Sequence, residues 1–258
     1  MTQQELLNTA LCQSATELGC RPEDLVSGQN TVVRSRPHPR ARRYLQLPFY
    51  CQLVSYGGGI VASVDPAVEQ PVRQYINSCP PEHCFETPQL HRLTQLLAPR
   101  GQLPCFMAAY FLPQLSASAP AGCPYPVRLL TAAQLAPLHG GRWPNALCDA
   151  RRELDVLAVG AYDGPHLIGL AGCSADCDTM WQIGIDVQPG YRRRGVAAAL
   201  THLLSQEILS RGKVPFYCAA WSNIPSVKNA LRAGFGPAWV ELTARPTGDT
   251  LAMAQPPL

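Results

Sequence analysis

The chain has 258 residues, of which 47% are hydrophobic and 15% are charged, and its formal net charge is +3. At roughly 100–200 residues per domain, this length predicts one large domain or two ordinary ones. The apolar fraction excludes a chain that is disordered throughout. The small positive charge disfavours nucleic acid as the main partner.

The sequence indicates a cytoplasmic protein with no membrane partner. Its longest nearly uninterrupted apolar stretch runs from Leu103 to Leu112, and Pro104 interrupts it. A bilayer span needs about 20 apolar residues, roughly twice that length. The N-terminal residues Met1–Glu5 lack the basic start and the apolar run of a signal peptide.

The eleven cysteines do not predict disulfides or a metal site. Their number is odd and their spacing shows no repeated frame, which disfavours a disulfide scaffold. The segment Cys79–Cys84, with His83 inside it and His91 downstream, has donors for zinc. Its spacing matches no common zinc pattern, so we expect no metal here.

A proline-rich segment at residues 113–126 divides the chain. Prolines separated by small residues cannot form a helix or an inner strand, so this segment is expected to be a linker. We therefore expect an N-terminal α+β domain at 1–112 and a C-terminal domain at 127–258. The N-terminal domain is expected to form one wall of an acceptor cleft or the interface of a homodimer.

The N-terminal part is predicted to begin with a helix. Thr2 and Glu5 have the spacing of a capping box, and Gly19 marks the C-terminal end. The elements expected after it are strands at 31–34, 49–54 and 59–64, helices at 67–78 and 87–97, and a strand at 104–111.

The C-terminal part is predicted to be a mixed sheet with flanking helices. Three hairpin-linked strands followed by two crossover helices are typical of such a sheet. The elements expected are a strand at 127–130, helices at 132–139 and 144–154, strands at 156–162, 166–173 and 181–187, a helix at 196–210, a strand at 215–221, a helix at 225–233 and a strand at 238–243.

The clearest sign of chemistry lies between the strand at 181–187 and the helix at 196–210. Arg192, Arg193 and Arg194 precede the first helical turn, where the helix dipole disfavours each cation by about 0.3–1 kcal/mol. A bound anion offsets this cost, because free backbone N–H groups, the dipole and the guanidinium groups all attract it. Gly195 lets the backbone approach a bulky ligand. A solvated basic turn is the alternative.

Two motifs in this region resemble those of the GNAT superfamily of acyl-CoA N-acyltransferases. The pattern Arg-x-x-Gly-x-Ala at 192–197, directly after a strand that ends at Val187, resembles the family's pyrophosphate-binding loop. The block 223–235, with Asn-x-x-Ser at its start and Gly-Phe at its end, resembles the next conserved block. More loosely, the whole chain looks like two-domain bacterial members with an extra N-terminal domain.

The resemblance implies an N-acetyltransferase that moves an acetyl group from acetyl-CoA to a primary amine of a small molecule or peptide. It implies that the strands at 181–187 and 215–221 splay apart to admit the pantetheine arm, with the last block on the thiol side. The residues implied in cofactor binding are Ile185, Asp186, Val187, Arg192, Arg193, Arg194, Gly195, Val196, Ala197, Asn223 and Ser226.

The catalytic groups cannot be transferred from the family. Ala230 stands where many members have a tyrosine acid, and Trp181 and Gln182 stand near the position of a common glutamate. A base for the amine and an acid for the thiolate are still needed. Asp178 is our expected base.

Several other residues are candidates near the thioester. Tyr217, Ser226 and Cys218 are candidates for the thiol side, and Asp176 is a second candidate base. Asp186 alternates with Ile185 and Val187 along the strand, so its side chain is expected on the opposite face of the sheet from theirs. A salt bridge from Asp186 to an arginine is therefore preferred over catalysis.

Two other classes of function compete with the enzyme. A non-catalytic acyl-CoA-binding or sensory module is motivated by the missing tyrosine and glutamate. A nucleic-acid-associated protein is motivated by the basic run at 34–43. That run contains two prolines, and we expect it to be a solvated loop.

Overall fold

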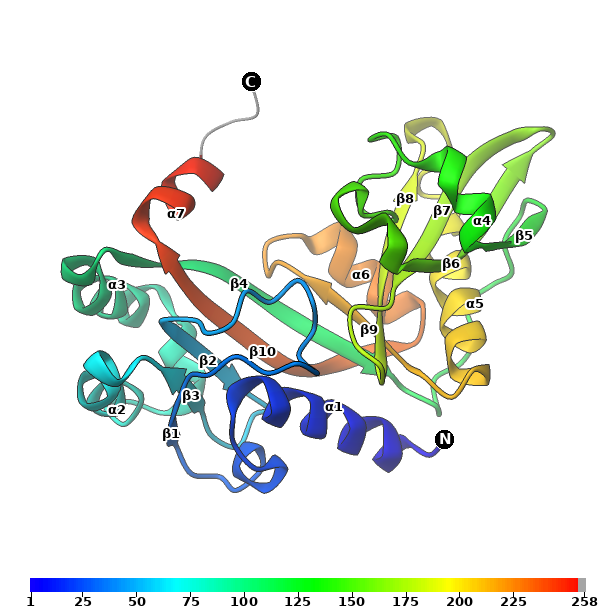
Figure 1. Cartoon of the computed structure of the whole chain (residues 1–258). Helices are drawn as coiled ribbons and strands as arrows, with labels where there is room; N and C mark the ends of the chain where they lie inside the picture. The colour runs from blue at the N-terminus through cyan, green and yellow to red at the C-terminus, as the bar shows by residue number, and fades with distance from the viewer. Residues whose placement is uncertain (255–258) are drawn as a thin grey trace. The chain divides into compact units, whose positions relative to one another are not determined.

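A computed structural model describes residues 1–254 of the chain (Figure 1). The chain forms two compact units: the first comprises residues 1–10 and 110–237, and the second comprises 11–109 and 238–258. This division differs from the expected linear one. Strand β10 (Phe235–Pro246) pairs with β2 (Cys51–Ser55), which brings the end of the chain into the second unit. Residues 255–258 of the expected C-terminal domain lie outside the described part.

The first unit is the expected mixed sheet with helices, so the α+β class is confirmed. Its strands lie in the order β9-β8-β7-β6-β5, with β8 and β9 parallel and the other neighbours antiparallel. The elements are β5 (Val127–Thr131), α4 (Ala132–Leu135), β6 (Asp155–Asp163), β7 (His166–Ser174), β8 (Met180–Val187), α5 (Val196–Ser210), β9 (Val214–Ala219) and α6 (Ile224–Arg232).

Helix α5 covers one face of this sheet. A Cβ added at Gly169 of β7 would lie 3.1 Å from Val196 and 3.3 Å from Leu200, so the helix packs directly on the strand. The buried residues Val196, Leu200 and Leu204 follow the spacing of one helical face. Leu203 of the same helix is 37% exposed.

The other face carries residues 143–148, and here the predicted helix at 144–154 is wrong. Only Asp149–Leu154 is helical, as a 3₁₀ helix. A Cβ at Gly172 or at Gly184 would lie within 2.0 Å of the carbonyl oxygen of Ala146 or Asn145, so the segment touches the strands backbone to backbone. Its N–H groups donate to carboxylates of the sheet, and this replaces helical hydrogen bonding.

The second unit is a five-stranded sheet in the order β1-β3-β2-β10-β4. The helices α2 and α3 pack on one face through a shared apolar core. Helix α7, which was not expected from the sequence, follows β10. The remaining elements are α1 (Gln3–Leu18), β1 (Thr31–Arg34), β3 (Val61–Val64), α2 (Glu69–Ile76), α3 (Thr87–Leu97), β4 (Gln102–Pro113) and α7 (Thr247–Met253).

Helix α1 begins as its sequence predicts. The backbone N–H of Thr2 donates to Glu5 Oε2 at 2.6 Å, and the N–H of Glu5 donates to Thr2 Oγ1 at 3.2 Å. The capping box is therefore confirmed. None of the helices in residues 1–254 has the length and apolar character that crossing a bilayer would require.

The arginines of the basic run at 34–43 are solvated except at one position. Arg42 is 2% exposed, whereas the other arginines of the run are exposed. Its guanidinium donates to Glu17 of α1 and to Glu241 of β10, each at 2.6 Å. Both carboxylates are also buried. The expectation of a solvated loop is wrong for Arg42, because a buried charge requires ionic partners.

We expect Arg42→Met to lower the free energy of unfolding by about 3–5 kcal/mol, because it leaves two buried carboxylates without a counter-charge. Urea unfolding measures this difference. The matched control is Arg43→Met, which removes an exposed guanidinium next to it and should change stability by less than about 0.5 kcal/mol. Equal effects of the two substitutions would contradict the assignment.

Candidate functional site

Strands β8 and β9 pair over only part of their length. Met180–Ile183 pair with Val214–Tyr217, and the described register ends there. On its other side, β8 remains paired with β7 as far as Val187. Within the described pairing, residues 184–187 therefore have a strand neighbour on one side only, as the expected splay requires. The free edge offers backbone hydrogen-bonding groups to a peptide-like ligand.

The loop after β8 turns into helix α5 through two left-handed residues. Gly195, the N-cap of α5, has φ 81°, and Arg193 has φ 62°, which is uncommon for a residue other than glycine. Among residues 1–254, no side chain caps α5. The first N–H groups of the helix are consequently available to an anion.

A cavity of about 520 Å³ lies between this loop and helix α6. Arg192 and Arg193 line it, and Arg192 Nε donates to the carbonyl oxygen of Val187 at 2.9 Å. Within residues 1–254 neither arginine forms an ion pair with a carboxylate. The lining consists of Val187, Tyr191, Arg192, Arg193, Gly195, Val196, Ala197, Ala198, Ile224, Pro225, Lys228, Asn229 and Arg232.

Two positively charged residues of this lining were not expected from the sequence. Lys228 and Arg232 lie one turn apart on α6 and both face the cavity. Residues four apart share a helix face, so their spacing was a usable signal. With the two loop arginines they give the cavity four cations and no carboxylate.

Arg194, the third expected loop arginine, is held elsewhere. Its Nη1 donates to Tyr125 Oη at 2.8 Å, and its guanidinium lies 5.8 Å from the ring centre of Tyr191. Tyr191 in turn donates from its hydroxyl to Asp163 Oδ2 at 2.8 Å. Arg194 is outside the cavity lining, and its contacts stabilise the loop between β8 and α5.

The structure brings Tyr217, Ser226 and Asn223 together beside the cavity. Tyr217 Oη lies 2.8 Å from Ser226 Oγ, and Asn223 caps α6 by accepting from the Ser226 N–H at 3.2 Å. Burial raises the pKa of the Tyr217 phenol, and hydrogen bonds with Ser226 and Asn229 oppose that rise. Asn229 lines the cavity, so this group borders it.

Asp178, the expected base, is not brought to this group. It is exposed and precedes β8, and its carbonyl oxygen accepts from Lys213 Nζ at 2.7 Å. Because β8 and β9 are parallel, residues before them lie at the paired end, away from the splayed one. Asp176 is buried and accepts from Ser174 and Arg151.

Asp186 does not form the salt bridge that alternation suggested. Its Oδ2 accepts from the N–H groups of Asn145 and Ala146 at 2.8 and 3.0 Å, and its Oδ1 accepts from Asn145 Nδ2 at 2.6 Å. The carboxylate thus fixes residues 143–148 on the face opposite α5. Its neighbour Val187 lines the cavity on the α5 side, in agreement with the alternation.

A group of titratable side chains at the paired end of the sheet was also not expected from the sequence. The side chain of His139 is 3% exposed; its Nδ1 lies 3.1 Å from Asp149 and its Nε2 lies 3.7 Å from Asp155. Burial raises the pKa of Asp155 to about 6, although the Cys148 N–H opposes the rise. Both ring nitrogens of His139 face carboxylates, so the imidazole positions this segment and offers no free nitrogen to a substrate.

The raised pKa of Asp155 predicts a pH dependence of stability. The folded protein holds this proton more tightly than the unfolded chain, so the stabilisation is complete below the ordinary pKa of 3.8 and is lost as pH rises through about 6. From pH of about 4 to about 7, the stability of Asp155→Asn relative to the parent should rise by roughly 2–3 kcal/mol.

Urea unfolding over a pH series measures this difference. The control Glu153→Gln removes an exposed carboxyl nearby and should leave the pH profile of the parent unchanged. A constant difference between Asp155→Asn and the parent across the series would contradict the expected shift.

Comparison with known proteins identifies one segment. Residues 128–235 match the model of the acetyltransferase (GNAT) family. Among curated proteins, none matches the chain at a significant level.

Solved structures with related folds share little sequence with this chain. A Drosophila protein is 17% identical, covering 95% of this chain and 91% of its own, with a TM-score of 0.45. A GCN5-related N-acetyltransferase from Kribbella flavida is 18% identical over 62% of this chain and 66% of its own, also with a TM-score of 0.45. A GNAT acetyltransferase from Colwellia psychrerythraea is 14% identical over 62% and 63%, with a TM-score of 0.43. The chain thus spans less than two thirds of the length of these last two proteins. The family-model match makes residues 128–235 a GNAT acetyltransferase domain.

Proposed function

We propose that the GNAT domain transfers an acetyl group from acetyl-CoA to the primary amine of a small molecule or peptide. The observation that carries this proposal is the cavity at the N-terminus of α5. It has four cations and no carboxylate, and it lies next to the strand edge that β9 leaves unpaired. A ligand with an anionic end and a peptide-like arm matches both features.

The residues present fit the parts of acetyl-CoA. The pyrophosphate would be held by Arg192, Arg193 and the free N–H groups of the first turn of α5. Backbone groups of Ile185 and Val187 would pair with the pantetheine amides, since this edge has no strand partner in the described register. Lys228 and Arg232 add positive charge on the α6 side.

Acetyl-CoA, when bound, supplies an activated acyl group and a thiolate leaving group. Tyr217 is our proposed proton donor to that thiolate, because its hydrogen-bonded group with Ser226 borders the cavity and a phenol, with an ordinary pKa of about 10, is protonated near neutral pH. Ser226 orients the phenol through their 2.8 Å hydrogen bond. The amine acceptor must bind uncharged or lose a proton to a base, and Asp178 lies away from the cavity.

A second candidate function is a non-catalytic acyl-CoA-binding or sensory module. The cavity lining contains no carboxylate and no histidine, so no side-chain base with a pKa near neutrality faces it. Ala230, at the position of the family's tyrosine, is fully buried. Binding of acetyl-CoA without release of free thiol on any amine would favour this function.

We expect Arg193→Glu to weaken acetyl-CoA binding by roughly 100-fold, because it replaces a charge-assisted contact with repulsion. Isothermal titration calorimetry measures the dissociation constant. Arg36→Glu, which makes the same change of charge at an exposed position outside the domain, should leave the affinity within about twofold. An unchanged affinity of Arg193→Glu for acetyl-CoA would contradict the cofactor assignment.

We expect Tyr217→Phe to lower kcat by roughly 100-fold or more with little change in KM, since general acid catalysis contributes about 10²–10⁴-fold. The assay follows thiol release across a panel of amines. Asp178→Asn tests the sequence-based expectation of a base, and the geometry predicts no loss of kcat. A large loss of kcat in Asp178→Asn, together with unchanged kcat in Tyr217→Phe, would contradict the role proposed for Tyr217 and support Asp178 as the base.

A further inference from the structure

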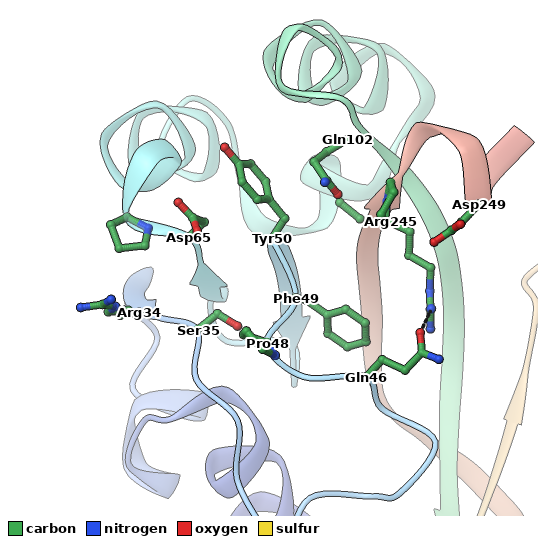
Figure 2. A pocket seen from close by; sticks show the side chains of 13 residues that line it. Arg34, Ser35, Gln46, Pro48, Phe49, Tyr50, Asp65, Gln102, Arg245 and Asp249 are labelled. Atoms are coloured by element: carbon green, nitrogen blue, oxygen red, sulfur yellow. Dashed lines mark hydrogen bonds between the residues drawn. The ribbon is translucent and has the colours of Figure 1, made fainter.

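A second cavity, of about 450 Å³, lies in the second unit, outside the GNAT segment (Figure 2). It forms at one end of the sheet, where β1, β3 and β10 finish and where β2 and β4 begin. Its lining consists of Arg34, Ser35, Gln46, Pro48, Phe49, Tyr50, Asp65, Pro66, Gln102, Ala244, Arg245, Pro246 and Asp249. Nothing in the proposed acyl transfer uses these residues.

The strand register places a carboxylate and a guanidinium on opposite sides of this cavity. Continuing the β2–β3 and β2–β10 registers sets Asp65, Tyr50 and Arg245 side by side, and the Asp65 N–H donates to the Tyr50 carbonyl oxygen at 2.9 Å. Two strand spacings separate the backbones of Asp65 and Arg245 by roughly 10 Å. Figure 2 shows Tyr50 and Phe49 between them.

Both charged groups are oriented but not neutralised. Asp65 Oδ1 accepts from the Ala67 N–H at 2.9 Å. Arg245 Nη1 donates to Gln46 Oε1 at 2.7 Å, and its guanidinium lies 5.5 Å from the ring centre of Phe49. Within residues 1–254, neither Asp65 nor Arg245 forms an ion pair. Each therefore keeps its charge for a ligand.

Polar side chains and flat apolar surfaces also line this cavity. Ser35 is 8% exposed and its hydroxyl is buried without a hydrogen-bond partner in the described structure. A buried unpaired hydroxyl is costly, and a ligand that supplies the missing hydrogen bond removes that cost. The side-chain amide of Gln102 also lines the cavity, and Pro48 and Pro66 add apolar surface.

We propose that this cavity binds a short peptide of two or three residues, with its terminal ammonium on Asp65 and its terminal carboxylate on Arg245. An extended residue spans about 3.3–3.6 Å. A tripeptide therefore spans the roughly 10 Å between the backbones of Asp65 and Arg245, whereas a single amino acid does not. The peptide amides match the hydroxyl of Ser35 and the amide of Gln102. The volume lies within the usual range for small-ligand pockets.

A peptide bound in the opposite direction would place its terminal charges on the other two charged residues of the lining. Arg34 and Asp249 are exposed, and no contact of their side chains orients them in residues 1–254. The proposed direction uses the two oriented charges, because a preorganised group loses less conformational entropy on binding. Reversed binding would use Arg34 and Asp249 instead.

Calorimetry with trialanine tests the proposal on the full chain. We expect trialanine to bind, and its N-acetyl and C-terminal amide forms to bind at least tenfold more weakly, because each lacks one terminal charge. Single alanine should also bind at least tenfold more weakly. The absence of trialanine binding, or equal binding of alanine and trialanine, would overturn the peptide assignment.

Four variants test which charges hold the peptide. Asp65→Asn and Arg245→Met should each weaken trialanine binding by roughly 10- to 100-fold, and asparagine at position 65 still caps the helical turn. Asp249→Asn and Arg34→Met are matched controls and should change the affinity less than threefold. The reverse pattern, or no effect of any variant, would overturn the proposed contacts. Unchanged acetyl-CoA affinity in all four variants would show that the first cavity is intact.

Discussion

The parallel pairing of β8 and β9 ends after Ile183, and the candidate acyl-CoA site depends on this limited pairing. Residues 184–187 keep β7 as a neighbour, so β8 remains a strand while its other edge is open. The loop that follows then turns through left-handed Arg193 and Gly195 into an uncapped helix. A strand edge without a strand neighbour and a helix terminus without a side-chain cap, in the described residues, thus meet at one cavity.

The side chains around this cavity separate binding from chemistry. Arg192, Arg193, Lys228 and Arg232 surround it with positive charge, which suits an anionic ligand and supplies no base. At the paired end of the sheet, the buried side chains of His139 and Asp155 are engaged in contacts of their own. Tyr217, hydrogen-bonded to Ser226 beside the cavity, is our proposed proton donor.

Hydrogen-bonded and ion-paired carboxylates also decide how loops lie on the sheets. Asp186 holds residues 143–148 against glycines of β7 and β8 through three hydrogen bonds. In the second unit, Arg42 draws its loop against α1 and β10 through two buried carboxylates. In both cases the carboxylates and the groups that bind them come from distant parts of the chain. In the second unit the charges are also buried, so they require these partners.

The sequence by itself determined most local elements and the pattern of the loop that leads into α5. Helix α5 matches its predicted bounds, and the capping box at Thr2 and the Arg-x-x-Gly-x-Ala pattern are local signals, because caps, dipoles and turn residues act within a few positions. Tertiary structure alone decided which distant groups meet. It set Lys228 and Arg232 beside the loop, removed Asp178 from the cavity, buried Arg42 and replaced the helix expected at 144–148 with a segment held by Asp186. These outcomes depend on strand register and on the pairing of buried charges, and residues far apart in the sequence determine both.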